Sequence, residues 1–445
     1  MLTYQLKKAP GMPLYESLYR LLREDIRTGK LSPGEKLPSK RALAAHLEVS
    51  VITVEAAYEE LLSEGYIRSK EKVGYFVEEY RRPPAVTAPT IPAPDPAPRG
   101  TVEGFPFSVW SRLQREVVLD YGEKLLLPLP NRGVPELRNA IARHLASFRG
   151  MTVDPENILI GAGTDFLYNL LIQLLGRDYT YAVEDPGYGK IRSIYAAGGV
   201  TCLPTPMDDS GVRPDALGDA RVLHISPSHH YPTGLVTPPA RRRELLDWAN
   251  RNRGWIIEDD YDSEFRFHAH PMSAMQTMDA QRVIYMNSFS KSLAPSIRIS
   301  YMVLPTALMA KFQRELGFYS CTVPSFEQYT LARFLSLGHF EKHINRMRKF
   351  YRSCRKKVVA RIKSSPMADR LTIRELDAGL HFLLQVDTSI PDSAFRAAGI
   401  PFPTLGSFYA DKRENLHTLV VSYAGLKDET LDEALEKLEQ LILAE

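Results

Sequence analysis

A proline-rich stretch constrains the fold of this chain more than any other feature. Between Arg81 and Gly100 there are seven prolines, mostly spaced by small or β-branched residues. Proline fixes φ and has no amide hydrogen, so the stretch favours an extended, polyproline-like tether that rises about 3 Å per residue. A chain of 445 residues also exceeds the usual size of one hydrophobic core. We therefore expect folded domains at 1–79 and 105–445, joined by a linker at 80–104.

Charge and hydropathy exclude some classes of protein but do not by themselves indicate DNA binding. The net charge is +3, and residues 1–80 carry twelve Lys and Arg against twelve Asp and Glu. Evidence for DNA binding must therefore come from sequence pattern. No stretch is long and apolar enough to span a membrane, and Met1–Arg23 lacks the apolar core of a signal peptide. These features predict a cytoplasmic protein without a membrane partner.

The three cysteines agree with that location. Cys202, Cys321 and Cys354 are odd in number and widely spaced, without the rhythm of disulfide pairs or zinc ligands. We assign them no role.

Before the proline-rich stretch, the pattern predicts three helices and a hairpin. Leucines at helical spacing indicate a helix over 14–28, and serines at 39 and 50 can each cap a further helix, ending near 47 and 64. Alternating residues at 66–68 and 75–77 predict a two-stranded wing. This is the order of a winged helix-turn-helix.

After that stretch, apolar strand-like runs alternate with amphipathic helical ones. This rhythm predicts an α/β fold with a mainly parallel sheet covered on both faces. From about 317 to 445, a long charged helical region and short strands at 380–386 and 417–423 predict a smaller α+β lobe. The predicted strands of the larger part are 157–160, 181–183, 222–225, 255–257 and 283–286.

The first part resembles the GntR family of bacterial regulators. The resemblance covers nearly all of residues 10–78 and includes GKLSPGEKLPSKRALA at 29–44 and VSVITV at 49–54. It implies that the helix after Ser50 enters the DNA major groove and that the wing tip enters the minor groove. The DNA contacts implied by the family and by the basic cluster at 36–41 are Lys40, Arg41, Ser50, Thr53 and Gly74.

One departure from the family affects sequence recognition. The family often has Arg after the Val-Ser pair, whereas this chain has Val51, which can only touch a thymine methyl group or pack. The balanced charge predicts weak binding by one copy, so we expect two copies on an operator with two half-sites. The alternative is a winged helix used for protein contacts, with Lys40 and Arg41 as solvated surface charges.

A glycine-rich turn in the second part imitates a dinucleotide-binding motif. Gly161, Gly163 and the later Glu184 have suitable spacing, but Phe166 replaces the third glycine and is too bulky for close helix-strand packing. NAD is therefore not expected. Gly163 and Thr164 can still offer amide groups and a hydroxyl to a monophosphate.

The segment NSFSKSLAPSIR at 287–298 follows a predicted strand and closely resembles the lysine segment of fold-type I enzymes that use pyridoxal 5'-phosphate. The resemblance implies that Lys291 forms a Schiff base with this cofactor. It also implies that Ser288, Ser290 and Arg298 bind the cofactor phosphate.

Three further segments match the same enzymes. By resemblance, Asp259 keeps the pyridine nitrogen protonated, Tyr261 contacts the ring hydroxyl, and Tyr188 stacks on the ring. In the Tyr-Pro-Thr-Gly loop, Tyr231 stands where ordinary aminotransferases have Asn.

Together the two parts resemble MocR-type regulators of the GntR family. The resemblance implies an N-terminal winged helix-turn-helix and a fold-type I aminotransferase-like domain, with a large domain and a small lobe. It further implies a head-to-tail homodimer in which pyridoxal 5'-phosphate, or an amino-acid-like compound that forms an aldimine with it, changes DNA binding. The alternative is an aminotransferase that retains catalytic activity.

The expected carboxylate clamp is missing. Aminotransferases of this fold hold the substrate carboxylate with an Arg in the last strand, and Val420 falls at or next to that position. We therefore expect weak or no transaminase activity, with the cofactor itself as effector and its synthesis, or amino-acid metabolism, as the controlled process. Arg192, Lys190 and His381 remain alternative carboxylate ligands.

Two histidine pairs raise the possibility of a metal site. His229-His230 lies within the cofactor-family loop, and His268 and His270 are two residues apart. Neither pair has a carboxylate or cysteine cluster at ligand spacing, so no metal is expected.

Overall fold

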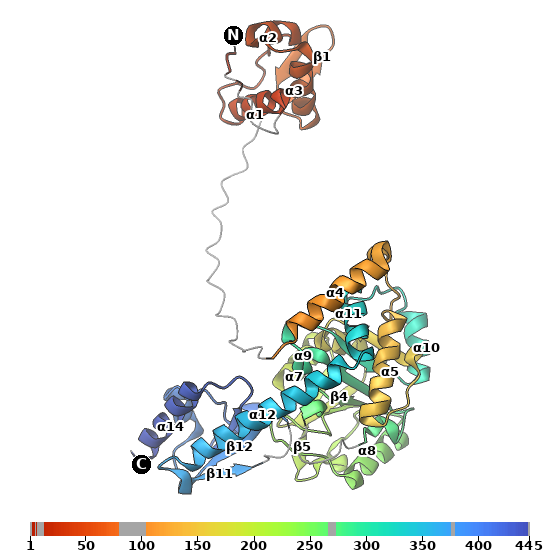
Figure 1. Cartoon of the computed structure of the whole chain (residues 1–445), viewed down its shortest axis with the longest axis vertical. Coiled ribbons are helices and arrows are strands. Elements are labelled where there is room, and N and C mark those ends of the chain that lie inside the picture. The colour runs from red at the N-terminus through yellow and green to blue at the C-terminus, as the bar shows by residue number, and fades with distance from the viewer. Residues whose placement is uncertain are drawn as a thin grey trace. The chain divides into compact units, whose positions relative to one another are not determined.

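The computed structural model describes residues 2–4, 6, 13–79, 104–265, 273–374 and 379–443. The chain divides into two compact units, Met1–Arg99 and Gly100–Glu445, and each is described by itself (Figure 1). Except for Gly104, the predicted linker lies outside the described residues, as do His268 and His270. The domain bounds inferred from the sequence stay a prediction.

The N-terminal unit contains three helices followed by a hairpin, in the predicted order. Its elements are α1 (Leu14–Arg27), α2 (Lys40–Leu47), α3 (Val51–Ser63), β1 (Ile67–Lys70) and β2 (Gly74–Val77). The Ser39 hydroxyl accepts a hydrogen bond from the Ala42 amide at 3.2 Å, and the Ser50 hydroxyl accepts one from the Thr53 amide at 3.1 Å. These contacts satisfy amides that have no partner within the first turn, so both serines fix where their helices begin.

A small apolar core holds these elements together. Leu22 of α1 and Val54 and Leu61 of α3 have no exposed surface. The Tyr58 ring is equally buried, and its hydroxyl donates to the Pro38 carbonyl at 2.9 Å. Because a buried hydroxyl needs a partner, this bond ties the loop before α2 to the core.

An eight-stranded mixed sheet forms the centre of the C-terminal unit. Its order is β3-β10-β9-β8-β7-β4-β5-β6, with β9, β8, β7, β4 and β5 parallel to one another. Strand β10 is antiparallel to both neighbours, and β6 is antiparallel to β5. The strands are β3 (Ile158–Gly161), β4 (Thr180–Asp185), β5 (Thr201–Asp208), β6 (Gly211–Val212), β7 (Val222–Ile225), β8 (Trp255–Asp259), β9 (Val283–Ser288) and β10 (Ser300–Val303).

Helices cover both faces of this sheet, because successive strand residues point to opposite sides. Ile158 and Ile160 pack into a core shared with α4, α5 and α11, whereas Leu159 packs into a core shared with α6, α7 and α10. The helices of this part are α4 (Phe107–Tyr121), α5 (Pro135–Arg149), α6 (Thr164–Leu175), α7 (Gly189–Ala197), α8 (Pro239–Arg251), α9 (Phe289–Ser292), α10 (Thr306–Glu315) and α11 (Ser325–Ser336).

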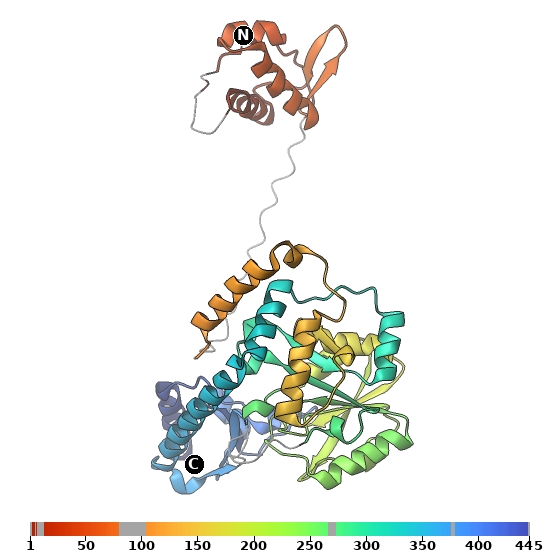
Figure 2. The same ribbon diagram turned by 45° about the vertical axis from the view of Figure 1, so that its right-hand side comes forward.

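A small lobe follows, connected by a long helix. Helix α12 contributes Phe340 and Ile344 to a core of the large sheet and Val358 and Ile362 to the core of the lobe. Figure 2 shows it running from the sheet to the blue C-terminal part. The lobe contains an antiparallel sheet in the order β11-β12-β13. Its elements are α12 (His339–Lys363), β11 (Leu371–Arg374), β12 (His381–Val386), α13 (Asp392–Ala397), β13 (Thr418–Ser422) and α14 (Asp428–Leu443).

The predicted fold class is confirmed, with differences in detail. All five predicted strands of the larger part are present, but β5, β6 and β10 were not predicted. The lobe also begins later than expected, because α11 packs with α5 in a core of the large sheet. Within the described ranges, no helix is both long and apolar enough to cross a membrane.

Candidate functional site

A cavity of about 530 Å³ opens at the carboxyl edge of the parallel strands. Glu184, Asp259 and Ser288 project from β4, β8 and β9 respectively, and Ser226 follows β7. Open α/β sheets bind ligands at this edge. Every predicted cofactor residue except Gly163 lines the cavity: Thr164, Tyr188, Asp259, Tyr261, Ser288, Ser290, Lys291 and Arg298.

Asp259 supplies a carboxylate at the floor of the cavity. Its Oδ2 accepts a hydrogen bond from the Tyr168 hydroxyl at 2.5 Å and lies 3.6 Å from Nε2 of His224. Its Oδ1 is buried and has no hydrogen-bond partner within the described part of the chain. Leaving a buried carboxylate oxygen without a hydrogen bond costs free energy, so this atom is suited to accept a hydrogen bond from a ligand. The protonated nitrogen of a pyridine ring would satisfy it.

A second carboxyl group, Glu184, lies in the same cavity. Burial raises its pKa to about 8 despite the hydrogen bond from the Ser226 amide, and Asp259 contributes to the shift. Its Oε2 also lies 3.5 Å from Nε2 of His230. Burial and the neighbouring His229 lower the pKa of His230 to about 3. Both partners are therefore predominantly neutral at pH 7.

An anion cradle forms at the beginning of α6. Gly163 precedes the helix with φ of 91°, and a Cβ at this position would overlap the guanidinium of Arg298. The Ser288 and Ser290 hydroxyls lie 3.0 Å apart, and Ser300 donates to Ser288 at 2.9 Å. Amides of a helix start, hydroxyls and a guanidinium together suit a phosphate monoester. Gly163 does not line the cavity, but it forms part of the cradle because it lies against the Arg298 guanidinium.

Lys291 lies between this cavity and a smaller one of about 110 Å³. It is exposed in the short helix α9, directly after β9. The smaller cavity is lined by both the large domain and the lobe, including Tyr231, Asp262 and Ser422. An amine in this position can react with a ligand in the larger cavity while facing a second compound in the smaller one.

Aromatic side chains surround the lysine. Tyr188 is half exposed, and its ring lies 6.1 Å from that of Tyr231 in an edge-to-face arrangement. Burial, followed by the charge of Asp262, holds the pKa of Tyr261 well above its usual value. Its hydroxyl therefore stays protonated and can donate a hydrogen bond to a ring oxygen. Tyr188 is free to cover a flat ligand.

The histidines near the site have partners that the sequence did not reveal. His229 bonds Asp262 through Nδ1 at 2.8 Å, and its ring lies 4.8 Å from the ring of His381. Asp262 lies 33 residues from His229 in the sequence, so only the fold brings this carboxylate to the histidine. Among the residues the structure describes, no group of three His, Cys, Asp or Glu side chains is arranged to hold a metal.

The alternative carboxylate ligands each have a partner within the protein, although Lys190 lines the larger cavity and His381 lines the smaller one. Lys190 pairs with Asp165 at 2.7 Å, and Arg192 lies 3.5 Å from Asp185. His381 bonds the Pro232 carbonyl through Nε2 at 3.0 Å.

At the position of the expected clamp, Val420 is buried with 1% of its surface exposed, and Ser422 is the β13 residue that lines both cavities. A valine cannot bind a carboxylate.

A buried ion pair fixes the strand end that carries Asp259. Arg149, at the end of α5, lies 3.1 Å from Asp260 and donates to the Ser228 hydroxyl at 3.0 Å. Asp260 also accepts from the Tyr285 hydroxyl at 2.6 Å. This network could not be predicted from the sequence, since its members come from four separate segments.

Tyr168, Glu184 and Ser422 were not predicted as site residues. A signal existed for two of them. Tyr168 follows Thr164 by four residues, so both lie on one face of a helix, and Glu184 ends a buried strand at the ligand-binding edge. For Ser422 no signal existed, because only the packing of the lobe brings β13 to the cavity.

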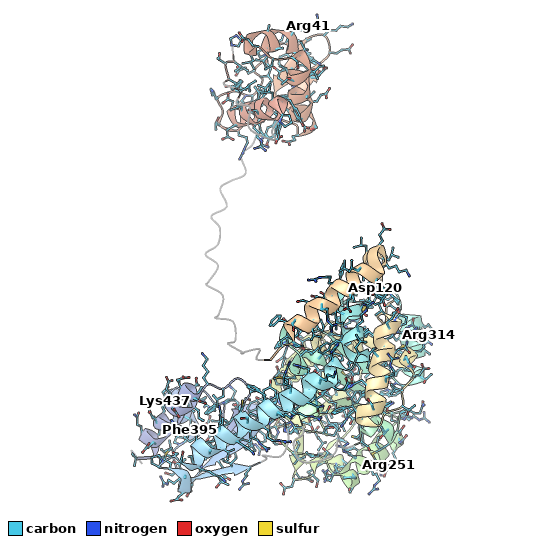
Figure 3. The ribbon with its side chains drawn as sticks, in the orientation of Figure 1. Arg41, Asp120, Arg251, Arg314, Phe395 and Lys437 are labelled. Carbon is cyan, nitrogen blue, oxygen red and sulfur yellow. The ribbon has the colours of Figure 1, made fainter. Side chains whose placement is uncertain are left out.

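The predicted DNA-binding residues of the N-terminal unit differ in how free they are. Arg41 is exposed at the surface of α2 (Figure 3). Lys40 pairs with Glu55 and lies over the Tyr75 ring.

The other predicted DNA contacts contribute local structure. The Ser50 and Thr53 hydroxyls lie 2.7 Å apart and bond each other within the helix cap. Gly74 begins β2 with φ of 129°, which a larger residue would adopt only under strain.

Two family models match the chain. The GntR family of bacterial regulatory proteins matches residues 14–77, and aminotransferase class I and II matches residues 103–438. The second match supports pyridoxal 5'-phosphate as the cofactor of the C-terminal unit.

The chain is also similar to curated regulators over almost its whole length. It is 36% identical to the uncharacterized HTH-type transcriptional regulator YdeL of Bacillus subtilis, over 97% of each chain. It is 32% identical to the probable rhizopine catabolism regulatory protein MocR of Rhizobium meliloti, over 99% of this chain and 96% of that one. It is 31% identical to the HTH-type pyridoxine biosynthesis transcriptional regulator PdxR of Corynebacterium glutamicum, over 82% of each.

Solved aminotransferases share the fold of the C-terminal unit. A kynurenine aminotransferase of Pyrococcus horikoshii matches with a TM-score of 0.66 and 22% identity, over 78% of this chain and 89% of that one. The α-aminoadipate aminotransferase LysN of Thermus thermophilus matches with a TM-score of 0.64 and 23% identity, over 77% and 90%. At this identity the likeness establishes the fold alone.

Proposed function

This chain belongs to the GntR family of bacterial regulatory proteins, in the MocR-type form that carries an aminotransferase class I and II domain, and from this premise we propose that it is a transcription regulator whose DNA binding responds to pyridoxal 5'-phosphate. The cofactor itself, or an amino compound that reacts with it, is the signal. The winged helix is the part that binds DNA in response to this signal.

One observation carries the proposal. Lys291, Asp259 with its unpaired Oδ1, and Arg298 of the anion cradle line one cavity, and Gly163 lies against the Arg298 guanidinium. An amine, a proton acceptor and a phosphate site are the three groups that this cofactor requires. Their presence in a chain that also carries a winged helix supports a link between the cofactor and DNA binding.

Each residue has a defined task. When bound, pyridoxal 5'-phosphate supplies an aldehyde that reacts with amines and a ring that withdraws electrons. Lys291 provides the amine for covalent attachment, and Asp259 holds a proton at the ring nitrogen, oriented by the Tyr168 hydroxyl. Tyr188 covers the ring, and Tyr261 donates to its oxygen.

The phosphate is held by the beginning of α6 together with three side chains. Thr164 supplies a hydroxyl and the helix supplies free amides. Ser288, Ser290 and Arg298 complete the cradle.

The side chains available to bind a substrate carboxylate favour a regulatory role over a metabolic one. The β13 position that would clamp a substrate carboxylate is the buried Val420, while Lys190 and Arg192 are paired with Asp165 and Asp185. A retained aminotransferase activity is the second candidate, supported by the complete set of cofactor residues.

The relatives suggest the target and the assembly. One relative is described as a regulator of pyridoxine biosynthesis, which supports control of cofactor synthesis as the process. We propose that two copies form a head-to-tail homodimer in the cytoplasm and bind an operator with two half-sites, since residues 1–80 have no net excess of positive charge.

Absorbance and DNA retardation test the proposal together. Wild-type protein with pyridoxal 5'-phosphate should gain the visible band of a lysine-bound cofactor, and its shift of the duplex upstream of its own gene should change. Lys291→Ala should lose both responses, whereas Lys342→Ala, at an exposed position of α12, should keep both. If Lys291→Ala responds as wild type does, the proposed switch is wrong. Conversion of the bound cofactor to its amine form by added amino acids would instead favour the aminotransferase.

A further inference from the structure

Two apolar side chains are exposed at the beginning of α3. Ile52 has 75% of its surface exposed and Val51 has 42%. Both stand in the first helical turn, directly after the Ser50 cap. Val54, two residues further along the helix, is fully buried. Other residues therefore form the core of the unit, and the first two residues of α3 face the solvent.

The charges around α3 determine which end a nucleic acid can approach. There is no acidic residue in the first turn, and Lys36 and Arg41 are exposed before the helix, alongside the exposed acidic residue Glu48. Glu59 and Glu60 are exposed towards the other end. Phosphates are attracted to the beginning of the helix, where its free amides point, and are repelled from its end. A duplex therefore meets Val51 and Ile52 first.

The polar groups of this turn are already engaged. The Ser50 hydroxyl accepts from the Thr53 amide and bonds the Thr53 hydroxyl. Hydrogen bonds from the first turn to base edges would have to compete with the cap. Aliphatic contact is what the remaining side chains can offer.

Only one group on the base edges of the major groove is apolar, the C5 methyl of thymine. We infer that Val51 and Ile52 recognise thymine methyl groups, so that each half-site carries thymine where the first turn of α3 enters the groove. The inference rests on the proposed DNA-binding function and adds a base preference to it.

Removing single methyl groups tests this contact. Full-length protein is first used to select duplexes from a library with a randomised core. Each thymine of the selected duplex is then replaced by uracil, which lacks only the C5 methyl. At one or two positions per half-site, we expect wild-type affinity to fall about four-fold, the value for one buried methyl-sized group.

Protein variants complete the test. Ile52→Ala and Val51→Ala should each weaken binding to the thymine duplex by a similar factor, and each should become insensitive to uracil at the position it contacts. The fold should tolerate both, because the side chains are exposed. Val118→Ala is the matched control, since Val118 is an exposed valine of α4, outside the N-terminal unit, with 47% of its surface exposed. Its sensitivity to uracil should equal that of wild type.

Several results would overturn the inference. Wild-type affinity that is unchanged by every uracil replacement would do so, as would equal losses in wild type and in both helix variants. Unchanged DNA binding but altered self-association in Ile52→Ala would assign the patch to a protein contact instead. If wild type selects no duplex, the proposed function fails as well, whereas uracil-insensitive binding removes the base preference alone.

Discussion

The two units present their candidate sites in opposite ways. In the N-terminal unit, Arg41, Ser50 and Ile52 lie on the surface of neighbouring elements and close together in the sequence. In the C-terminal unit, the cavity gathers residues from Thr164 to Ser422, and Asp259 within it is only 5% exposed. The first site depends on local structure and the second on the packing of the whole unit.

This difference determines how each site responds to change. A surface site loses contacts one at a time, so substitutions there have modest and separable effects. A buried site contains charges and hydrogen bonds in a medium of low polarity, where each unpaired group is costly. Substitutions in the cavity should therefore have larger effects than substitutions at the surface site of the N-terminal unit.

The largest effect is expected at the contact between the large domain and the lobe. Gly379 has φ of +68°, and a Cβ there would overlap the His229 ring. Gly379→Ala should lower the free energy of unfolding of the C-terminal unit by about 3 kcal/mol, from backbone strain and overpacking together. Urea denaturation followed by tryptophan fluorescence measures it.

A matched glycine separates the two causes. Gly399 has the same φ of +68°, but the nearest atom to its Cβ would be Lys437 Nζ at 3.7 Å. Gly399→Ala should therefore cost only the strain, about 1 kcal/mol. Equal losses in both variants would mean that the contact with His229 contributes nothing.

The next effect concerns the floor of the cavity. Asp259→Asn removes the charge that the ring nitrogen needs, and should weaken binding of pyridoxal 5'-phosphate by about 10- to 100-fold, the range for a hydrogen bond to a charged group. Tyr168→Phe removes only the bond to Oδ2 and should have a smaller effect. Equilibrium dialysis measures both. DNA binding without cofactor should not change, and a loss there would contradict the separation of the two sites.

Local features of the chain could be predicted from the sequence better than pairings between distant segments, for a physical reason. The helix caps at Ser39 and Ser50 are local features, so the pattern located α2 and α3 directly. Asp259 ends β8 and Lys291 follows β9, both at a known ligand-binding edge of the sheet. Strand β10 was missed because Ser300–Val303 is a short apolar run whose pairing between β3 and β9 depends on distant segments.

Contacts between segments that are distant in the chain could not be predicted from the sequence. The Arg149–Asp260 pair and the His229–Asp262 bond join residues that no local spacing connects. Ser422 reaches the cavity only because the lobe packs there. Lys40 and Arg41 were predicted as equivalent DNA contacts, and only the fold distinguishes them, because it pairs Lys40 with Glu55.

A pH-dependent effect follows from Glu184. Its pKa is raised from 4.5 to about 8, so between these values the folded protein holds a proton that the unfolded chain has lost. This contribution to stability is complete below pH 4.5 and is lost as the pH rises through about 8. Glu184→Gln cannot ionise and should remove it. Between pH 6 and 7, the stability of cofactor-free wild type should fall relative to the variant by about 1 kcal/mol. Parallel pH profiles in denaturant titrations would contradict the shift.

The smallest effect is expected in the N-terminal unit, where neighbouring cations provide their own control. Arg41 is exposed, so Arg41→Ala should weaken DNA binding about five-fold and reduce the slope of log affinity against log salt by about 0.9 per copy, as for one lost phosphate contact. Lys40 is already paired with Glu55, so Lys40→Ala releases an acid as well as removing a base, and any direct phosphate contact would require breaking that pair. Its salt slope should stay closer to that of wild type. Fluorescence anisotropy at several salt concentrations distinguishes the two, and neither variant should alter cofactor absorbance. Equal slopes for both variants would show that the ion pair between Lys40 and Glu55 does not prevent Lys40 from contacting DNA. Local contacts would then determine the behaviour of the surface site less strongly than packing determines that of the cavity.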